Sequence, residues 1–382
     1  MKQKRKIVYL AGFLFSIPLA LTSYINSSFL GNYINKYYIS ILYVTASILT
    51  IVGMFRLPQI FTAIGNRRST ILFSLIFFLS LVMLAVADKG SIIIFAFVLY
   101  FISFNFIVAA LDIFIENFSI HSEIGGIRGI FLSITSLAWV VAQTISGSII
   151  TKSSFRGIYL ISGLFMVLVY FLVYFFLQDF KDPEYKKISV RKIIKLFIQN
   201  KHLSRIYLIS LILKLFYAWM IIYMPIYLHE YVGFAWDEIG IIFSIMLIPF
   251  VLLDFPLGKL SDKVGEKKIL LFGFVIISIF TLIIPLIGVK ILWLWALILF
   301  LTRIGAATIE TMSESYFFKY VTEEDASTMS FFRNSGPLSF IIGPALAIPV
   351  LFFVPSFQYL FFILGIILLS GLFISLRLRD VR

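Results

Sequence analysis

The sequence predicts an all-α membrane protein whose twelve transmembrane helices form two parallel six-helix bundles. Three observations lead to this prediction. The chain is 61% hydrophobic and only 13% charged, apolar runs recur along its whole length, and basic residues gather in alternate connections. A soluble domain is about 45–50% apolar and about 25% charged. The composition therefore excludes a soluble enzyme, a disordered chain and a disulfide-linked secreted domain.

Each predicted span is an apolar run of about the 20 residues that a helix needs to cross the hydrocarbon core. Charged residues, Gly, Pro or Asn separate the runs. The first run follows Met-Lys-Gln-Lys-Arg-Lys but has no small-x-small cleavage site, so we expect a retained helix rather than a signal peptide. The spans are expected at 7–24, 42–62, 70–87, 92–115, 127–150, 158–177, 206–228, 239–257, 269–288, 292–311, 329–353 and 359–376.

The basic residues give the predicted orientation. With the N-terminus inside, the cytoplasmic segments hold 24 of the 32 Lys and Arg residues, whereas the outer segments hold five. Cytoplasmic loops of membrane proteins carry such an excess of Lys and Arg. We therefore expect a multi-pass protein of the plasma membrane with both termini in the cytoplasm. We therefore attribute the net charge of +13 to basic residues that face the inner membrane surface, and not to binding of nucleic acid.

The longest segment without a span, residues 178–205, divides the chain into an N-terminal bundle (1–177) and a C-terminal bundle (206–382). Within this linker, apolar residues between 190 and 197 follow helical spacing, with basic residues on the other face. This pattern predicts an amphipathic helix at the anionic inner surface. The linker is either a plain connection with a basic face or a regulatory element.

The two halves resemble each other at an offset of about 200 residues. The loop after the second span contains Gly65-Asn66-Arg67-Arg68, and the loop after the eighth contains Gly265-Glu266-Lys267-Lys268. Two parallel repeats of this kind are expected of one transporter architecture. Pairs of carboxylates four residues apart, which share a helix face, lie near the ends of the fourth and tenth spans: Asp112 with Glu116, and Glu310 with Glu314.

The later of these loops carries a longer motif, Gly258-Lys-Leu-Ser-Asp262-Lys-Val-Gly265-Glu-Lys267-Lys268. With this motif and the layout of six plus six helices, the whole chain resembles the major facilitator superfamily. The earlier loop departs from the motif, because Pro58 and Thr62 stand where a glycine and an acid would be, and the antiporter signature of the fifth helix is missing. The resemblance implies secondary transport by alternating access, with a cavity lined by the first, fourth, seventh and tenth helices.

The resemblance also implies a cytoplasmic gate in which Asp262 reaches the start of the fifth helix, where Arg128 lies. The alternative is that the motif only shapes the loop and sets the topology. Glu116 and Glu314 are expected to neutralise the basic pairs of the two loops. The predicted gate comprises Gly65, Arg67, Arg68, Glu116, Arg128, Gly258, Asp262, Gly265, Lys267, Lys268, Glu314 and Arg333.

Two cations within the predicted spans, Lys214 and Arg303, are candidates for substrate contact. An ionisable group inside a membrane is costly and usually faces a cavity or a partner. They are expected to favour an anionic or polyhydroxylated solute, since a guanidinium group binds two oxygens of a carboxylate. The alternative is an internal salt bridge to Asp254, Glu310 or Glu314. The other predicted binding residues are Tyr24, Asn105, Tyr217 and Tyr223.

Three carboxylates that lie deeper in the spans, Asp112, Asp254 and Glu310, are candidates for carrying a coupled proton. Burial of a carboxylate and a nearby cation have opposite effects on its affinity for a proton. Facilitated diffusion and coupling to another ion remain alternatives.

The sequence predicts no catalytic or metal chemistry. There is no Cys, and the three His residues lie far apart in the chain, so neither a metal centre nor a cofactor is expected. The expected partners are a small-molecule solute, the lipid bilayer and protons, and the expected oligomeric state is a monomer. Two alternatives on the same fold are a multidrug or metabolite efflux pump and a non-transporting sensor or scaffold.

Overall fold

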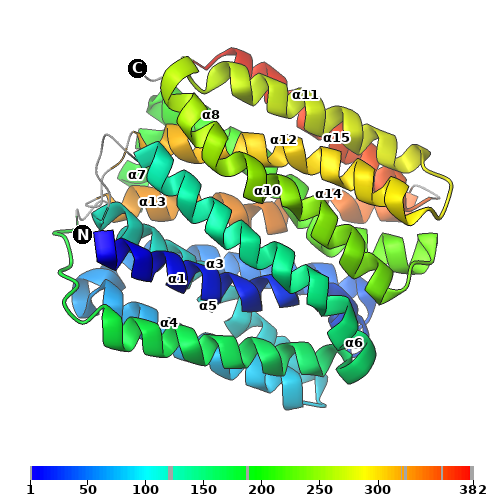
Figure 1. Ribbon diagram of the computed structural model, residues 1–382, viewed down its shortest axis with the longest axis horizontal. Helices are drawn as coiled ribbons and strands as arrows, with labels where there is room; N and C mark the ends of the chain where they lie inside the picture. Colours follow the sequence, from blue (N-terminus) through cyan, green and yellow to red (C-terminus); the bar gives the residue numbers. More distant parts are fainter. Residues whose placement is uncertain are drawn as a thin grey trace.

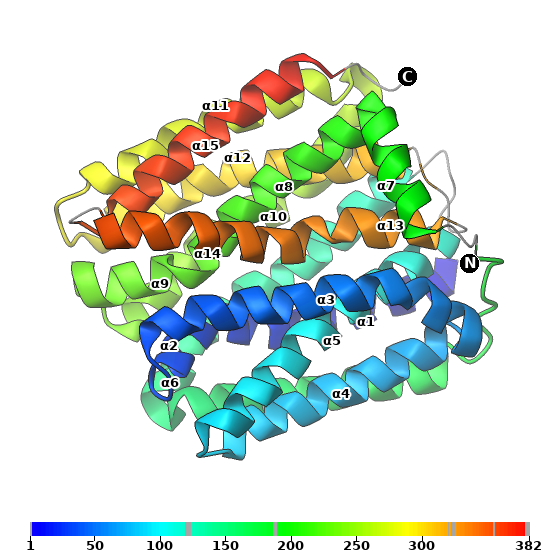
Figure 2. The same ribbon diagram turned by 180° about the vertical axis from the view of Figure 1, so that it is seen from behind.

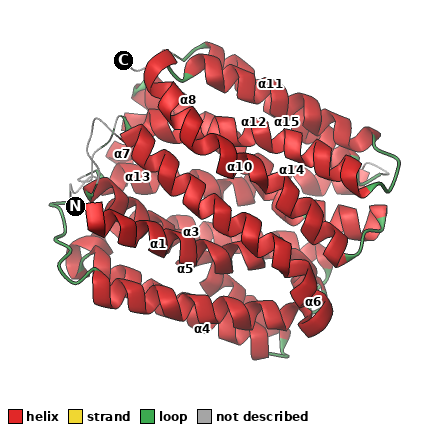
Figure 3. Cartoon of the chain, in the orientation of Figure 1, coloured by secondary structure: helices red, strands yellow, loops and turns green. Residues whose placement is uncertain are grey.

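The computed structural model describes residues 2–118, 124–185, 189–319, 321, 325–353 and 356–378, without the side chains of residues 2, 36, 37, 124, 125, 262 and 263. Within these ranges the secondary structure is entirely helical (Figure 3). The fold is that of an all-α membrane protein, as the sequence predicts.

The helices follow one another with short connections. Most bury one stripe of side chains and expose apolar residues elsewhere, which is expected of helices that face lipid. In chain order they are α1 (Lys2–Ser23), α2 (Asn26–Gly31), α3 (Lys36–Ile64), α4 (Asn66–Val86), α5 (Gly90–Asn117), α6 (Ile124–Phe176), α7 (Val190–Gln199), α8 (Lys201–Ile222), α9 (Met224–Ile226), η2 (Tyr227–Val232), α10 (Trp236–Val264), α11 (Lys267–Ile283), η3 (Ile284–Leu286), α12 (Leu292–Phe318), α13 (Ala326–Arg333), α14 (Ser335–Phe353) and α15 (Tyr359–Leu376).

The described residues contain eleven helical segments long and apolar enough to cross a membrane, and one of them is long enough to cross twice. Helix α6 has 53 residues, but Ser154 has the non-helical angles φ 63° and ψ −179°. At about 1.5 Å per residue, 53 residues exceed twice the roughly 30 Å of a bilayer core. The chain therefore turns back at Ser154. Figure 1 shows the turn within α6 at the lower right, and this turn brings the eleven segments to the predicted twelve passes.

The helices form two bundles, one from α1 to α6 and one from α8 to α15. In Figure 1 the first bundle lies below the second, and Figure 2 shows the same division from behind. The N-terminus, the end of the described chain and helix α7 all lie at one end of the molecule. We call this end the linker end and the other the opposite end.

Helix α7 is the amphipathic helix that the linker pattern predicts. It buries Ile193 and Phe197 and exposes Arg191, Lys192 and Lys195. The ring of Phe197 packs against Phe331 of α13, with 4.5 Å between the ring centroids. The linker helix is therefore attached to the second bundle by aromatic packing.

The two bundles meet most extensively along α6 and α10, where glycines allow the backbones to touch. A Cβ atom at Gly147 would lie 2.6 Å from the carbonyl oxygen of Trp236 and 2.8 Å from Cα of Asp237. A Cβ atom at Gly240 would lie 3.2 Å from the carbonyl oxygen of Gln143. This stretch of the interface, at the opposite end, leaves no space for a side chain at Gly147.

The loop glycines 200 residues apart have nearly the same backbone conformation. Gly65 has φ 82° and ψ 155°, and Gly265 has φ 80° and ψ 166°. These angles are accessible mainly to glycine, because a side chain would clash with the backbone. The residues that follow, Asn66 and Glu266, are both fully buried. Asn66 donates a hydrogen bond to the carbonyl oxygen of Ala110, and Glu266 forms an ion pair with Lys319.

In the first bundle the loop motif lacks its own acid, and the linker supplies a carboxylate at the same loop. Asp182 accepts a hydrogen bond of 2.6 Å from the backbone N–H of Asn66, the first residue of α4. A carboxylate at a helix N-terminus is stabilised by the helix dipole. The hydroxyl of Tyr185 donates a second hydrogen bond to Asp182. Burial and this carboxylate raise the pKa of Tyr185, so the hydroxyl remains a donor.

Candidate functional site

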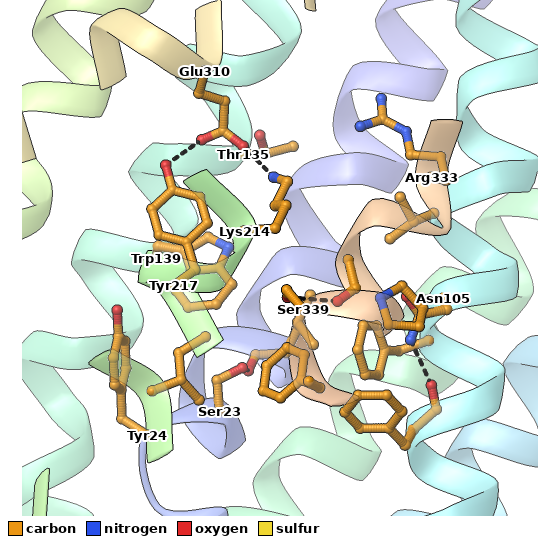
Figure 4. A pocket seen from close by; sticks show the side chains of 18 of the residues that line it. Ser23, Tyr24, Asn105, Thr135, Trp139, Lys214, Tyr217, Glu310, Arg333 and Ser339 are labelled. Atoms are coloured by element: carbon orange, nitrogen blue, oxygen red, sulfur yellow. Dashed lines mark hydrogen bonds and ion pairs between the residues drawn. The ribbon is translucent and has the colours of Figure 1, made fainter. Parts of the chain in front are cut away.

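A cavity of about 320 Å³ lies between the two bundles, with side chains from α1, α2, α3, α5, α6, α8, α10, α12, α13 and α14 around it (Figure 4). Its walls differ in character. Three of its four charged side chains, Lys214, Arg303 and Glu310, come from α8 and α12 of the second bundle. The first bundle contributes mainly aromatic rings and small polar groups.

Lys214 and Glu310 form an ion pair in the cavity wall, with 2.6 Å between Nζ and Oε1. The hydroxyl of Tyr217 donates to the other oxygen, Oε2, at 2.9 Å, as Figure 4 shows. The Lys214 and Glu310 side chains are 23% and 20% exposed. Lys214 is therefore held by the internal salt bridge that was the alternative to substrate contact, although it still borders the cavity.

Arg303 lines the same cavity, and its residue is 1% exposed. Its guanidinium carbon lies 4.7 Å from the centroid of the Phe216 ring, and Nη1 donates to Oγ1 of Thr302 at 3.4 Å. No carboxylate among the described side chains forms an ion pair with it. A buried guanidinium held only by a ring and a hydroxyl is costly, which is consistent with a site that receives an anion.

The wall from the first bundle is aromatic. The ring of Tyr43 stacks on Phe340 of the second bundle, with centroids 5.5 Å apart. Asn105 lies on this wall and donates from Nδ2 to the carbonyl oxygen of Phe101 at 2.8 Å (Figure 4). The binding residues predicted from the sequence do not include Tyr43, Tyr100, Phe101, Phe104 or Trp139. Helical spacing from Asn105 would have found Phe101 and Val108, since residues three and four apart share a face.

Two predicted binding residues lie near the opposite end, Tyr24 and Tyr223, and only Tyr24 lines the cavity. Tyr24 lines the cavity, and its ring packs against Phe243 of the second bundle with centroids 4.7 Å apart. Tyr223 is not among the residues that line this cavity, so its role in substrate binding stays a prediction. Helix α8 ends at Ile222, and the Tyr223 hydroxyl lies 3.4 Å from Oγ of Ser40 on α3. Tyr223 therefore joins the two bundles beyond the cavity.

The linker side of the cavity ends in a buried cluster of two arginines and three carboxylates, which we call the gate network. Arg128 Nη1 lies 2.7 Å from Asp112 Oδ1, and Nη2 lies 3.4 Å from Glu116 Oε2. Arg333 Nε lies 2.6 Å from Asp112 Oδ2, and Nη2 lies 2.7 Å from Glu314 Oε2. Asp112 is on α5 and Arg333 is on α13, so the network connects the two bundles.

These pairs bear on two of the expectations from the sequence. Asp112 was a candidate proton carrier, but two guanidinium groups hold it within the gate network. Glu116 and Glu314 pair with Arg128 and Arg333. The loop residue Arg67 instead donates to backbone carbonyl oxygens of Val173 and Tyr174.

Most of the remaining predicted gate residues lie at or near the loop between α10 and α11, and Arg68 lies in the first bundle. Gly258 is buried in α10, Gly265 ends that helix, and Lys267 begins α11, followed by the exposed Lys268. In the first bundle Arg68 is exposed in the first turn of α4. The side chain of Asp262 lies outside the described residues, so the predicted contact between Asp262 and Arg128 stays a prediction.

Asp254 differs from the other two candidate proton carriers. It is 1% exposed and accepts hydrogen bonds from Oγ1 of Thr311 at 2.8 Å and Oγ of Ser136 at 3.3 Å. Both donors are neutral, and no basic side chain in the described ranges forms an ion pair with it. Ser136 is on α6 of the first bundle, so this carboxylate also lies at the contact between the bundles.

Contacts between the bundles also close the opposite side of the cavity. Oγ of Ser27 donates to the carbonyl oxygen of Ile222 at 3.2 Å. The Tyr24–Phe243 contact and the Gly147 region of α6 and α10 lie at the same end. The cavity therefore lies between two sets of contacts, and each set joins residues from both bundles.

Comparison with known proteins places the chain among membrane transporters. The model of the Major Facilitator Superfamily matches residues 8–237 and 207–382. An uncharacterized MFS-type transporter of Methanocaldococcus jannaschii is 25% identical over 176 residues, which make up 45% of each chain, so the match spans less than half of that relative. The crystal structure of the human organic anion transporter MFSD10 (TETRAN) has a TM-score of 0.77 and 14% identity, covering 98% of this chain and 99% of that one. This last likeness concerns the fold alone.

Proposed function

The chain belongs to the major facilitator superfamily, and we propose that it is a secondary transporter that carries a small organic anion across the membrane by alternating access. The observation that supports an anion is Arg303, a buried guanidinium in the cavity wall with no carboxylate partner among the described residues. A guanidinium binds two oxygens of a carboxylate in one plane. The fold of an organic anion transporter over nearly the whole chain is compatible with this choice.

Alternating access would use the two sets of contacts in turn. In this proposal residues 1–177 and 206–382 are the moving bodies, and 178–205 links them. The gate network closes the linker end, whereas the Gly147 region and the Ser27–Ile222 hydrogen bond close the opposite end. The excess of basic residues at the linker end supports a cytoplasmic position of this end in a plasma-membrane protein.

Arg303→Gln tests the anion site. The purified protein is screened in detergent against organic acids, sugars, amino acids and lipophilic cations, with thermal stability as the readout. Organic acids are expected to raise the Tm, and the variant is expected to bind them about 10- to 100-fold more weakly, because a hydrogen bond to a charged group contributes about 1.5–3 kcal/mol. Arg303→Lys keeps the positive charge but lacks the planar guanidinium group. We expect its affinity for organic acids to lie between those of the wild-type protein and Arg303→Gln.

Other outcomes of this screen would change the functional assignment. Stabilisation by lipophilic cations alone would contradict the anion site and favour an efflux pump. If organic acids stabilised Arg303→Gln as much as the wild-type protein, the anion site would not include Arg303. The absence of any stabilising compound, together with a protein partner, would favour a sensor or scaffold.

We further propose that transport is coupled to protons and that Asp254 carries the proton. Asp112 and Glu310 are paired with basic side chains, whereas the partners of Asp254 are two hydroxyl groups. A carboxylate without a cation partner can lose its charge inside the membrane only by binding a proton. Its contact with Ser136 of the other bundle gives this charge a direct effect on how the bundles meet.

Asp254→Asn is expected to abolish the response of uptake to an imposed pH gradient. Asn keeps hydrogen bonds to Thr311 and Ser136 but cannot exchange a proton. The measurement is uptake of the stabilising acid into proteoliposomes, with and without a pH difference across the membrane. Asp237→Asn is the matched control, since Asp237 is exposed on the same helix. Uptake by Asp254→Asn that still follows the pH gradient would contradict the assignment.

A further inference from the structure

We infer that the cavity selects singly charged anions with an apolar, ring-bearing body, and that Glu310 sets the limit of one charge by holding Lys214. This inference rests on the proposed transport of an organic anion. It goes beyond that proposal because it assigns the number of charges on the substrate and the residue that determines this number.

The charges around the cavity leave one cation without a partner. Four charged side chains line it: Lys214, Arg303, Glu310 and Arg333. Arg333 is held by the carboxylates of Asp112 and Glu314 in the gate network, and Lys214 is held by Glu310. Arg303 therefore remains, and one substrate carboxylate neutralises it.

A second negative charge on the substrate would have no cation to meet. Every other basic group in the wall already has a carboxylate, and Lys214 with Glu310 forms a neutral pair that offers no charge to a second carboxylate. Arg303 and Glu310 lie on the same helix, seven residues apart, which corresponds to about 10 Å of axial rise. A carboxylate taken out of water without a cation partner is costly. The site therefore discriminates against dianions because a second carboxylate has no cation partner there.

The wall opposite Arg303 and Lys214 determines the rest of the molecule. Tyr43, Tyr100, Phe101, Phe104 and Trp139 line the first-bundle side of the cavity. Aromatic rings pack with other rings and with alkyl groups and bury a large apolar area. An anion with its carboxylate on Arg303 and an apolar body against these rings matches both walls.

The charge count predicts how this selectivity can be reversed. Replacement of Glu310 by Gln keeps an acceptor for the Tyr217 hydroxyl but removes the charge that neutralises Lys214. Lys214 then becomes a second cation beside the cavity, displaced from Arg303 along α12. A linear dianion long enough to reach both should now bind better than the matched monoanion.

The experiment compares octanoate with octanedioate, which have the same carbon chain and differ by one carboxylate, and adds 4-phenylbutyrate as a ring-bearing monoanion. Binding to the purified full-length protein is measured by calorimetry in detergent. We expect the wild-type protein to bind octanedioate about tenfold more weakly than octanoate, and 4-phenylbutyrate at least as tightly as octanoate. Glu310→Gln is expected to improve octanedioate binding about tenfold and to reverse the order.

Three further variants separate the explanations. Glu184→Gln removes a carboxylate from the exposed linker, so it controls for net charge and should keep the wild-type order. Lys214→Met combined with Glu310→Gln removes both members of the pair, leaves Arg303 as the cation and should restore the preference for monoanions. This double variant tests the limit of one substrate charge even if Glu310→Gln alone does not fold. Arg303→Gln should weaken all three acids.

The outcomes distinguish failure of this inference from failure of the proposed function. If wild-type protein binds octanedioate as tightly as octanoate while Arg303→Gln weakens both, the limit of one charge is wrong and the anion site stands. A double variant that prefers octanedioate would also overturn the limit. If none of the three acids depends on Arg303, the proposed anion transport itself fails.

Discussion

Replacement of Asp112 by Asn is expected to open the linker end of the protein. Asp112 binds Arg128 of its own bundle and Arg333 of the other, and it is 4% exposed. Removing the charge leaves both guanidinium groups buried with a weaker partner. Breaking a buried ion pair costs about 3–5 kcal/mol, which corresponds to roughly 100- to 5,000-fold in an equilibrium between closed and open conformations. We expect conformations open at the linker end to predominate.

The measurement is the distance between spin labels at the linker end. The chain has no Cys, so each introduced Cys gives a unique label. Ile64→Cys and Val264→Cys place the labels at exposed helix ends in corresponding positions of the two bundles. Asp88→Asn is the matched control, because Asp88 pairs with Arg156 at an exposed site where an ion pair contributes about 0–1 kcal/mol. An unchanged distance distribution in Asp112→Asn would show that the gate network does not hold this end closed.

The sequence was sufficient to predict the fold because lipid imposes a strong pattern on it. The spans, the two bundles and the turn at Gly65 and Gly265 follow from apolar length, the distribution of basic residues and a local motif. These features depend on residues close together in the chain. The family match and the twelve passes confirm this part of the prediction.

The partners of the charged residues could not be predicted in the same way. Asp112 and Arg333 are 221 residues apart, and no local pattern says that they meet. Asp182 lies in a linker that looked like a plain connection, yet it supplies the carboxylate that the first loop lacks. The cavity aromatics were missed for another reason. In a chain with 43 Phe and 19 Tyr, most rings face lipid or pack between helices, so composition cannot separate Tyr43 from the others.

Replacement of Gly147 by Ala is expected to have the opposite effect to Asp112→Asn and to open the opposite end. The new Cβ atom would lie 2.6 Å from the Trp236 carbonyl oxygen and 2.8 Å from Cα of Asp237, both backbone atoms of α10. Neither can move as a side-chain tip would, so α6 and α10 must separate there. Overpacking costs about 1–3 kcal/mol, or roughly 5- to 150-fold in the population of the closed conformation.

Labels at Ser91→Cys and Val289→Cys, exposed positions in the two bundles at the opposite end, would report this opening. Gly126→Ala is the control, since it lies on the same helix and a Cβ atom there meets nothing within 4 Å. Alternating access adds a stronger requirement than opening alone. Asp112→Asn should lengthen the linker-end distance without lengthening the other, and Gly147→Ala should do the reverse. If one variant opened both ends, the two sets of contacts would not be alternatives, and the protein could not couple transport to a gradient by closing one end before opening the other.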